Sequence, residues 1–421
     1  MQKIALIREG KTPPDRRVAL TPTQCEEVLD KYRLTDKDFE ILVQPSPIRC
    51  FTEAEYEKVG CKITEDISEA SILLGVKEVP KPQLISDKTY LFFSHTIKKQ
   101  PYNRELLQKI IEKNIRLIDY EVLTNEAGQR VIAFGRYAGI VGAYNGILTY
   151  GKRFGLFDLK PANECFDMEE MWSEFEKVKL PAIKIAVTGG GRVAKGSVEV
   201  LEGMKIKEVS PEDYLTKTFD EAVFTRLRSK DYHFKKGNTK EKKEFDLKDF
   251  YNNAANYESH FSDFSKETDL LIAAAYWNPK SPVLFTKDEM KQDDFKIKVI
   301  ADITCDIEGS IPSTKRPSTI AEPFYDYNAV SESEEKPFSS EENVTVMAVD
   351  NLPCELPRDA SRDFGRELID QVLPYLLFED NPHYLKEHNF SDGNRIKRAT
   401  IAEDKDLGED FEYLRDYLEG K

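Results

Sequence analysis

The middle of the chain reads Lys184-Ile185-Ala186-Val187-Thr188-Gly189-Gly190-Gly191-Arg192-Val193-Ala194-Lys195-Gly196. The apolar start of this stretch predicts a buried parallel strand, and residues 197–201 predict a helix that continues after the glycines. A strand, a glycine turn and a helix form the arrangement that a dinucleotide pyrophosphate needs. Glycines let the backbone approach the phosphates without a Cβ in the way, and the helix N-terminus offers free N–H groups to the anion.

The spacing of Gly189, Gly191 and Ala194 fits the pattern G-x-G-x-x-G/A. We therefore expect cofactor contacts from Gly189, Gly191, Arg192 and Val193. The alternative is a plain tight turn, because many glycine-rich loops bind nothing.

The choice of dinucleotide depends on the next predicted strand. An acidic residue that binds the adenosine ribose is expected about 20 residues after the turn. The next predicted strand, residues 206–210, ends in Ser210, and Glu208, Glu212 and Asp213 lie near it out of register. A carboxylate there would favour NAD, and its absence leaves room for the 2′-phosphate of NADP. The sequence thus predicts NAD(H) or NADP(H) without deciding between them.

Length, charge and cysteine content narrow the class of protein. The chain has 421 residues, which predicts at least two domains, and its net charge of −15 argues against nucleic acid as a partner. No apolar run approaches the roughly 18 residues that span a bilayer, and the N-terminus predicts a strand and no signal peptide. We therefore expect no membrane partner and a cytoplasmic location. The six cysteines form no C-x-x-C pair, which indicates reduced thiols and no metal site.

Strands and helices alternate along the chain, which predicts an α/β fold with parallel, doubly wound sheets. The expected strands are 4–8, 39–44, 72–76, 90–94, 115–118, 184–188, 206–210, 270–275, 297–301 and 344–349. Expected helices begin at Thr21 and cover 52–59, 103–112 and 138–157. Residues 225–268 indicate a polar surface excursion, 331–343 a loop, and the chain from Arg358 onward a helical segment.

Basic and titratable residues follow the first predicted strands, where ligands of open parallel sheets bind. Arg16 and Arg17 precede a helix and can hold a carboxylate with paired hydrogen bonds. Lys77 follows an apolar strand, where partial desolvation lowers the pKa of a lysine. His95 closes the next strand and can exchange protons near neutral pH. The alternatives are surface arginines, an ordinary exposed lysine and a structural histidine.

Three other predicted strands end in polar or aromatic residues. Glu121 follows the strand at 115–118, and Asp350 follows the strand at 344–349. Tyr276 and Trp277 follow the strand at 270–275 and could form the wall of a site for a flat ring. For each of these positions, a capping or packing role is the alternative.

Eight ordered motifs together resemble the lysine-forming saccharopine dehydrogenases. They are most similar to the lysine–oxoglutarate reductase domain of the bifunctional lysine-degradation enzyme, within a superfamily that includes alanine dehydrogenase and the transhydrogenase α subunit. The motifs are Arg17-Val18-Ala19-Leu20-Thr21-Pro22, Leu74-Gly75-Val76-Lys77, Phe93-Ser94-His95-Thr96-Ile97-Lys98, Arg116-Leu117-Ile118-Asp119-Tyr120-Glu121, Ala133-Phe134-Gly135-Arg136-Tyr137-Ala138-Gly139, the glycine turn with Thr188, Cys305-Asp306-Ile307-Glu308-Gly309-Ser310-Ile311 and Asp350-Asn351-Leu352-Pro353.

The resemblance implies two Rossmann-like domains with a cleft between them. It implies a substrate domain from residues 1–150 and 350–421, and an inserted dinucleotide-binding domain from residues 151–349. It also implies the reaction, a pyridine-nucleotide-dependent interconversion of saccharopine with L-lysine and 2-oxoglutarate. A separate enzyme would then process saccharopine, because no second catalytic domain is expected after residue 421.

The resemblance also implies roles for individual residues. Lys77 and His95 match the family's catalytic pair, Arg17 its substrate-binding arginine and Asp350 its cleft aspartate, which is expected to contact substrate and cofactor. Oxidation of a secondary amine needs a base for the amine proton, and imine hydrolysis needs a group that activates water, which a lysine and a histidine can share.

Secondary roles fall to residues near that pair. We expect Glu78 and Glu121 to modulate the pKa values of Lys77 and His95. Together with Arg16, they are also expected to line the substrate site. The nicotinamide is expected near Tyr276 and Trp277.

Two other functions are compatible with the same residues. One is an alanine-dehydrogenase-like enzyme that acts on a small amino acid with the same lysine and histidine. The other is a regulatory protein that binds the cofactor without turnover. The motif that contains His95 argues against the first, and the intact Arg17, Lys77 and His95 argue against the second.

Overall fold

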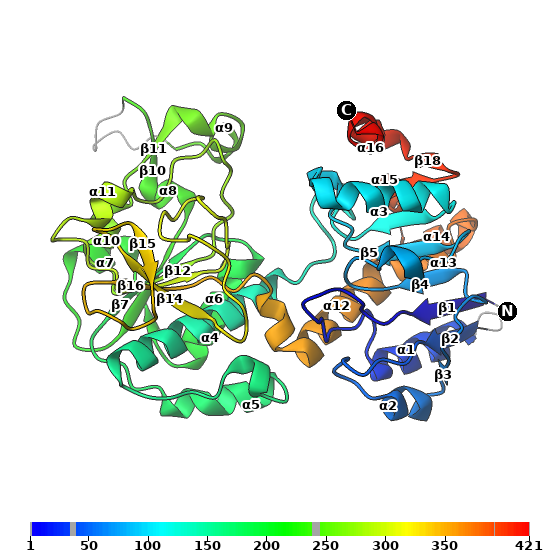
Figure 1. Cartoon of the computed structure of the whole chain (residues 1–421), viewed down its shortest axis with the longest axis horizontal. Coiled ribbons are helices and arrows are strands. Elements are labelled where there is room, and N and C mark those ends of the chain that lie inside the picture. The colour runs from blue at the N-terminus through cyan, green and yellow to red at the C-terminus, as the bar shows by residue number, and fades with distance from the viewer. Residues whose placement is uncertain (1, 34–38, 238–244, 391, 421) are drawn as a thin grey trace. The chain divides into compact units, whose positions relative to one another are not determined.

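The computed structural model describes residues 2–33, 39–237, 245–390 and 392–420, and its elements are labelled in Figure 1. The chain divides into two compact units, unit 1 (Met1–Phe134 and Pro357–Lys421) and unit 2 (Gly135–Leu356). Within the described residues, each unit contains one eight-stranded, mostly parallel sheet. The expectation of an α/β fold with two parallel-sheet domains is confirmed.

The sheet of unit 1 has the order β18-β17-β6-β5-β4-β1-β2-β3. Its strands are β1 (Gln2–Leu6), β2 (Phe39–Val43), β3 (Lys62–Ile63), β4 (Ile72–Leu74), β5 (Thr89–Phe92), β6 (Arg116–Asp119), β17 (Thr400–Glu403) and β18 (Asp406–Leu407). The chain builds outward from β1 through β2 and β3, then returns to the other side of β1 with β4. Ligands of such sheets bind at this switch point, beyond the carboxyl ends of β1 and β4.

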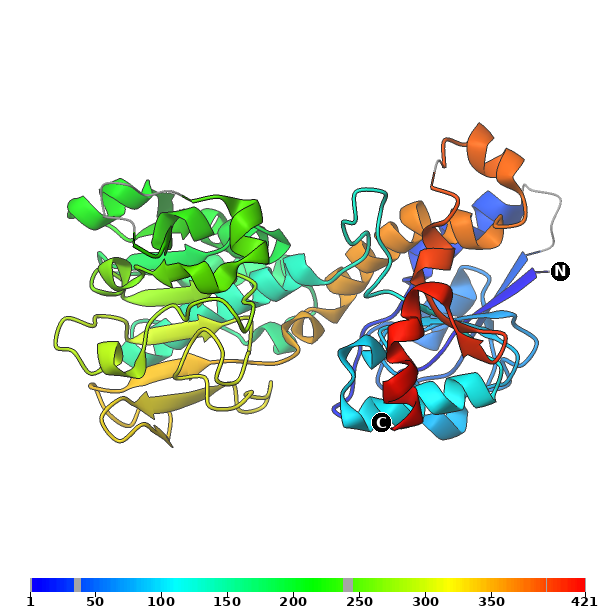
Figure 2. The same cartoon turned by 90° about the horizontal axis from the view of Figure 1, so that it is seen from above.

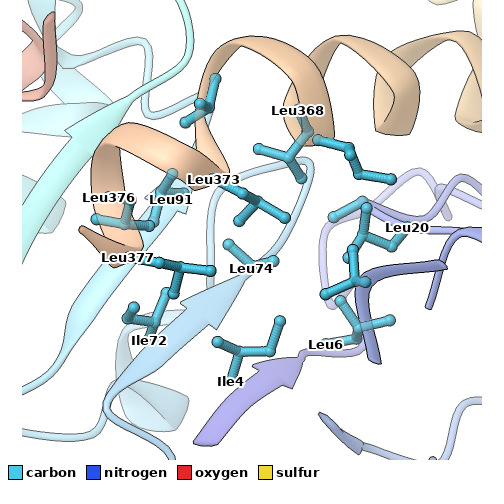
Figure 3. Packing of buried hydrophobic residues seen from close by; sticks show 14 of the residues in the cluster. Ile4, Leu6, Leu20, Ile72, Leu74, Leu91, Leu368, Leu373, Leu376 and Leu377 are labelled. Carbon is cyan, nitrogen blue, oxygen red and sulfur yellow. The ribbon is translucent and has the colours of Figure 1, made fainter. Parts of the chain in front are cut away.

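One face of this sheet is covered by helices from both ends of the chain. They are α1 (Pro22–Arg33), α2 (Glu53–Lys58), α12 (Pro357–Gln371) and α13 (Leu373–Leu377). Figure 3 shows Leu368 and Leu373 of these helices facing Leu74 and Leu91 of the strands. Burial of each such side chain stabilises the fold by about 1.5–3 kcal/mol. The segment from Pro357 onward is therefore part of unit 1.

The end of the chain packs against the other face of the unit 1 sheet. The hydroxyl of Tyr417 donates to the carbonyl of Gln100, and the side-chain amide of Gln108 donates to the carbonyl of Leu418, at 2.6 and 2.8 Å. Figure 2 shows this red C-terminal segment beside the cyan helix α3 (Pro101–Glu112). The chain after Arg358 was expected to be helical throughout, but β17 pairs with β6, because its buried, β-branched start fits a sheet better than a helix. The other helices here are α14 (Pro382–Glu387), α15 (Arg395–Ala399) and α16 (Arg415–Glu419).

The sheet of unit 2 has the order β15-β14-β16-β13-β12-β7-β9-β8, with β14 and β15 antiparallel. Its strands are β7 (Lys184–Thr188), β8 (Lys207–Glu208), β9 (Val223–Leu227), β12 (Leu270–Ala273), β13 (Val299–Asp302), β14 (Phe324–Asn328), β15 (Ser333–Glu335) and β16 (Val344–Met347). β15 lies within 331–343, which was expected to be a loop.

The interior position of β9 corrects the predicted surface excursion at 225–268. Residues 225–227 complete this strand, which lies between β7 and β8. Val223, Phe224 and Leu227 are buried, whereas both residues of β8 are exposed, so β9 is the strand that suits the interior of the sheet. The rest of the segment contains the hairpin of β10 (His233–Lys235) and β11 (Tyr257–Ser259), with short helices α8 (Ser229–Tyr232), α9 (Leu247–Asn252) and α10 (Ser262–Ser265). Residues 238–244 of it lie outside the described residues.

Unit 2 begins with α4 (Gly135–Phe154), which packs closely on α6 (Arg192–Gly203). A Cβ on Gly139 would lie 1.9 Å from the carbonyl oxygen of Val193, and a Cβ on Gly196 would lie 2.1 Å from that of Arg136. The hydroxyl of Ser197 donates to the carbonyl of Gly139 at 3.1 Å. Because this contact joins α4 to unit 2, the first boundary falls at 134/135 and not at the expected 150/151. The second falls at 356/357 and not at 349/350.

Candidate functional site

Lys77, Glu78 and His95 lie in two loops that leave the same edge of the unit 1 sheet. Glu78 follows β4 and His95 follows the neighbouring parallel strand β5. Nδ1 of His95 lies 2.6 Å from Oε1 of Glu78, and Nζ of Lys11 lies 2.8 Å from Oε2 of the same carboxylate. Only 11% of the Glu78 side chain and 18% of the His95 side chain are exposed. The structure thus places a histidine, a carboxylate and two lysines at the switch point of the sheet.

The charge of Glu78 determines which nitrogen of His95 carries a hydrogen. Burial opposes ionisation of Glu78, but hydrogen bonds from His95 and Lys11 lower its pKa to about 2. Because an ionised carboxylate only accepts hydrogen bonds, Nδ1 of His95 is the donor in this contact. Nε2 is then the ring nitrogen that can accept or release a proton.

The backbone of His95 is left-handed, with φ at 54°. This conformation costs a non-glycine residue about 1 kcal/mol, so neighbouring contacts must hold it. The N–H of Ser94 donates to Oδ2 of the buried Asp119 at 2.9 Å, and the Ser94 and Thr96 hydroxyls are 2.8 Å apart. Constraints of this kind gather at functional sites.

Glu9 belongs to the same cluster, although its position in the sequence did not single it out. Its carboxylate accepts the backbone N–H groups of Val76 and Lys77, at 2.7 and 2.8 Å. Burial, and next the charge of Asp15, raise the pKa of Glu9 to about 8. Glu9 follows β1, which pairs with β4, so its place at the end of the first strand was the signal that could have identified it.

The two arginines expected to hold a carboxylate have different environments. Arg17 is buried, and its Nε and Nη2 atoms donate to the two oxygens of Asp15 at 3.0 and 2.6 Å. Its guanidinium also lies 4.1 Å from the ring centre of Phe134. Arg16 is exposed. The structure therefore presents Arg16 to solvent and holds Arg17 in a buried ion pair.

Glu121 lies at the end of β6, one strand further along the same edge. Its side chain is 13% exposed and forms ion pairs with Lys98 at 3.5 Å and Arg130 at 3.4 Å. Its backbone N–H donates to Oδ1 of Asp119 at 2.7 Å. The buried carboxylate of Asp119 thus accepts the backbone N–H groups of both Ser94 and Glu121.

The glycine turn of unit 2 follows β7, at the switch point of the second sheet. Gly189 has φ at 102°, and its N–H donates to the carbonyl of Leu227 at 2.7 Å. Gly191 is the N-cap of α6, no side chain caps this helix, and a Cβ on Gly191 would meet nothing within 4 Å. Arg192 is exposed and Val193 partly exposed in the first turn of α6. The turn therefore leaves backbone accessible at a helix N-terminus.

A small pocket opens at the carboxyl ends of β7, β9 and β12. Its lining includes Thr188, Ser229, His233, Tyr276 and Trp277. The side chain of Tyr276 is exposed, whereas the Trp277 indole donates to the carbonyl of Pro282 at 3.2 Å. Burial lowers the pKa of His233 to about 4, so this ring is neutral at neutral pH. The two aromatic residues follow β12, which pairs with β7 on the side away from β9.

Asp350 and Ser210 occupy positions that differ from their expected ones. Asp350 follows β16, is exposed and belongs to unit 2, although the predicted boundary assigned it to the first domain. Burial, and next the charge of Asp350, raise the pKa of Cys305 to about 12.

Ser210 caps α7 (Pro211–Thr216) by accepting the N–H of Asp213 at 3.1 Å. Ser210 thus adjoins the edge strand β8, whereas the strand that pairs with β7 is β9.

Two further properties hold within the described part of the chain. None of the helices there combines the length and the apolar composition that crossing a bilayer requires. No group of three or more His, Cys, Asp or Glu side chains there could hold a metal ion.

Family models match both units. The model described as alanine dehydrogenase/PNT, N-terminal domain, matches residues 5–141, and the corresponding C-terminal domain model matches residues 173–401, more than half of the chain. The chain belongs to the alanine dehydrogenase/PNT family.

Several curated proteins and solved structures are similar to most of this chain. Alpha-aminoadipic semialdehyde synthase, mitochondrial, of Mus musculus is 29% identical over 99% of this chain and 48% of its own length. This chain therefore spans about half the length of that curated relative. The NAD(+), L-lysine-forming saccharopine dehydrogenase of Emericella nidulans is 26% identical over 88% of this chain and 91% of its own length. A solved L-alanine dehydrogenase structure covers 99% of the chain with a TM-score of 0.62 at 15% identity, which shows a shared fold.

Proposed function

We propose that this chain is a pyridine-nucleotide-dependent saccharopine dehydrogenase of the L-lysine-forming type, which interconverts saccharopine with L-lysine and 2-oxoglutarate. The observation that carries the proposal is the hydrogen-bonded cluster of Lys11, Glu78 and His95, with Lys77 beside it. The proposal is also supported by the similarity of this chain to the Emericella nidulans enzyme over most of both chains.

The residues of unit 2 fit a dinucleotide cofactor. We propose that Gly189, Gly191, Arg192 and Val193 bind the pyrophosphate of NAD(H) or NADP(H), because an added Cβ would crowd the turn at Gly189 and the helix end at Gly191 is open. When bound, the cofactor supplies the hydride acceptor or donor of the reaction. We propose that Asp350 contacts the substrate and cofactor, as expected from its motif.

Aromatic residues follow β12, the strand that pairs with β7. We propose that Tyr276 and Trp277 form the wall of a site for the flat nicotinamide ring, as expected from their position after this strand.

In unit 1, we propose that Lys77 and His95 share the proton transfers. Lys77 accepts the proton of the secondary amine, and Nε2 of His95 activates the water that attacks the imine carbon and then returns a proton to the leaving amine. Glu78 orients the ring through Nδ1 and compensates positive charge on it. Glu121 adds negative charge at the same edge of the unit 1 sheet, where it pairs with Lys98.

Substrate carboxylates require cationic partners. We propose that Arg16 contacts a carboxylate directly, since it is exposed, and that Arg17 takes part from its position beside Asp15. Two parallel N–H···O bonds from a guanidinium suit a carboxylate better than a single ammonium contact does. The small molecules lysine, 2-oxoglutarate and saccharopine are the partners of this proposal, and the cytoplasm is its compartment.

A substrate panel tests the proposal. Purified protein is mixed with NADH or NADPH, 2-oxoglutarate and each of several amino acids, and cofactor absorbance is followed. Lysine-dependent loss of absorbance with formation of saccharopine is expected. Alanine-dependent reduction of NAD without lysine activity would favour an alanine-dehydrogenase-like enzyme instead. Binding of nucleotide without turnover of any pair would indicate a regulatory protein.

A further inference from the structure

The strand beside the glycine turn is β9, and this changes where the adenosine ribose is recognised. β9 pairs with β7 in parallel, with Leu227 opposite Thr188. The N–H of Gly189 donates to the carbonyl of Leu227 at 2.7 Å, so the turn and the end of β9 touch. In dinucleotide-binding sheets of this type, the residue that ends the strand beside the turn faces the ribose 2′-position.

The residue after the end of β9 is Arg228. Measured from the position that a Cβ on Gly190 would take, its Cγ lies at 3.9 Å and its Nε at 4.0 Å. The side chain is exposed, and its guanidinium forms no ion pair with any residue of the described ranges. A guanidinium is therefore positioned over the glycine turn without a carboxylate that neutralises it.

The acidic residues near Arg228 bind groups other than its guanidinium. Oδ2 of Asp231 accepts the backbone N–H of Arg228 at 2.6 Å. Glu208 on β8 forms an ion pair with Arg226 at 3.5 Å. Neither carboxylate takes the role of the acid that binds the two ribose hydroxyls of NAD in such sheets.

Four basic side chains are exposed in the segments that adjoin the turn, although the whole chain has a net charge of −15. Arg192 and Lys195 in the first turn of α6 are exposed, as are Arg228 and Lys230 after β9. A surface of this sign attracts a ligand with more phosphate charge.

The geometry points to Arg228 as the residue that binds the 2′-phosphate of NADP(H), so that the enzyme selects the phosphorylated cofactor over NAD(H). This inference rests on the proposed function, because it assumes that the turn binds a pyridine dinucleotide. A guanidinium matches the planar array of phosphate oxygens with paired hydrogen bonds. NAD(H) lacks that phosphate and would leave the guanidinium in water, so it gains nothing from Arg228.

The experiment measures nucleotide binding directly, without catalysis. Isothermal titration of the full chain compares adenosine 2′,5′-bisphosphate with adenosine 5′-monophosphate (AMP), which differs from it only by lacking the 2′-phosphate. The variants are Arg228→Gln and, as a matched control with the same loss of charge two residues earlier, on β9, Arg226→Gln. We expect wild-type protein and Arg226→Gln to bind the bisphosphate more tightly than AMP by about tenfold or more, since a charge-assisted bond contributes on that order. Arg228→Gln should lose this preference and keep its affinity for AMP.

Each other outcome identifies which statement fails. Equal affinity of the wild-type protein for the two nucleotides, or an unchanged preference in Arg228→Gln, overturns the role of Arg228 and leaves the proposed reaction standing. Failure of both nucleotides to bind wild-type protein overturns the cofactor site itself and the inference with it. Lysine-dependent turnover, measured separately with NADPH and NADH, then tells whether the proposed function also fails. Arg228→Asp should shift the ratio of kcat/KM values toward NADH, because a carboxylate binds the ribose hydroxyls and repels the phosphate.

Discussion

Unit 1 and unit 2 place their candidate residues at corresponding edges of similar sheets, but they use different chemical groups there. In unit 1, Glu78 and Asp119 fix His95 and its neighbour through side-chain hydrogen bonds. In unit 2, Gly189 and Gly191 leave backbone open at the end of α6. Proton transfer needs titratable groups held in one orientation, whereas binding of a pyrophosphate needs side chains to be absent. The difference predicts that substitutions in the two units affect different measurements.

The largest expected effect is on turnover and comes from unit 1. His95→Ala and Lys77→Met should each lower kcat by about 100-fold or more, because each removes a group that transfers a proton in the reaction. Binding of adenosine 2′,5′-bisphosphate to unit 2 should not change. The measurement is steady-state turnover with lysine and 2-oxoglutarate, together with a binding titration.

Lys81→Met is the matched control for this loss of a lysine. Lys81 lies four positions further along the chain, at the surface, where it pairs with Glu105. Its substitution should leave kcat within about twofold, as expected for an exposed ion pair. Full activity of both His95→Ala and Lys77→Met would remove these residues from the mechanism.

The next largest effect is on stability and separates two kinds of glycine within unit 2. Gly139→Ala and Gly196→Ala should each destabilise the protein by about 1–3 kcal/mol, the range for overpacked interiors, because the new Cβ would overlap a carbonyl oxygen of the facing helix. Alanine favours a helix over glycine by about 1 kcal/mol, which is too little to compensate. Thermal unfolding followed by circular dichroism measures the change.

Gly191→Ala is the contrasting variant, since a Cβ there meets nothing within 4 Å. It should unfold at nearly the wild-type temperature and yet bind nucleotide less tightly, because the methyl group stands where a phosphate would approach. If Gly196→Ala were as stable as wild type, the close contact between α4 and α6 would not be a feature of the folded protein.

The same contrast shows what could be predicted from the sequence. Lys77, Glu78 and His95 were found because each follows an apolar strand, and a strand end is a local signal. Glu9 and Arg228 were missed because their importance depends on pairing between strands, β1 with β4 and β9 with β7. A count of residues from the glycine turn leads to β8, and only the order of strands shows that β9 takes the inner place.

Local sequence patterns also could not predict where some helical segments begin and end. The start of α4 at Gly135 reflects its contact with α6, which no periodicity within the segment shows. The strand β17 follows the short helix α15 and pairs with β6 in a sheet begun almost 400 residues earlier, at β1. Contacts of such long range are decided by the packing of the whole unit and not by propensity.

The smallest effect compares two buried carboxyl groups, one in each unit. Burial raises the pKa of Glu9 and of Glu355 to about 8, from an ordinary value of 4.5. A group whose pKa is higher in the folded state contributes stability at low pH, and this contribution is lost as pH rises from 4.5 through 8. Wild-type protein should therefore melt at a lower temperature at pH 9 than at pH 6, and Glu9→Gln and Glu355→Gln should each reduce that difference.

Activity then distinguishes the two carboxyl groups. Glu9 accepts the N–H groups of Val76 and Lys77, whereas Glu355 accepts only the side-chain amide of Asn145 at 3.0 Å among the hydrogen bonds found in the described residues. Glu9→Gln should therefore alter the pH dependence of kcat above pH 8, and Glu355→Gln should not. The exposed Glu164 serves as the control, since Glu164→Gln should change neither melting nor kcat. Identical pH–rate profiles for Glu9→Gln and wild type would show that the Lys77 loop keeps its position without Glu9, and the difference between the units would then rest on His95 and Glu78 alone.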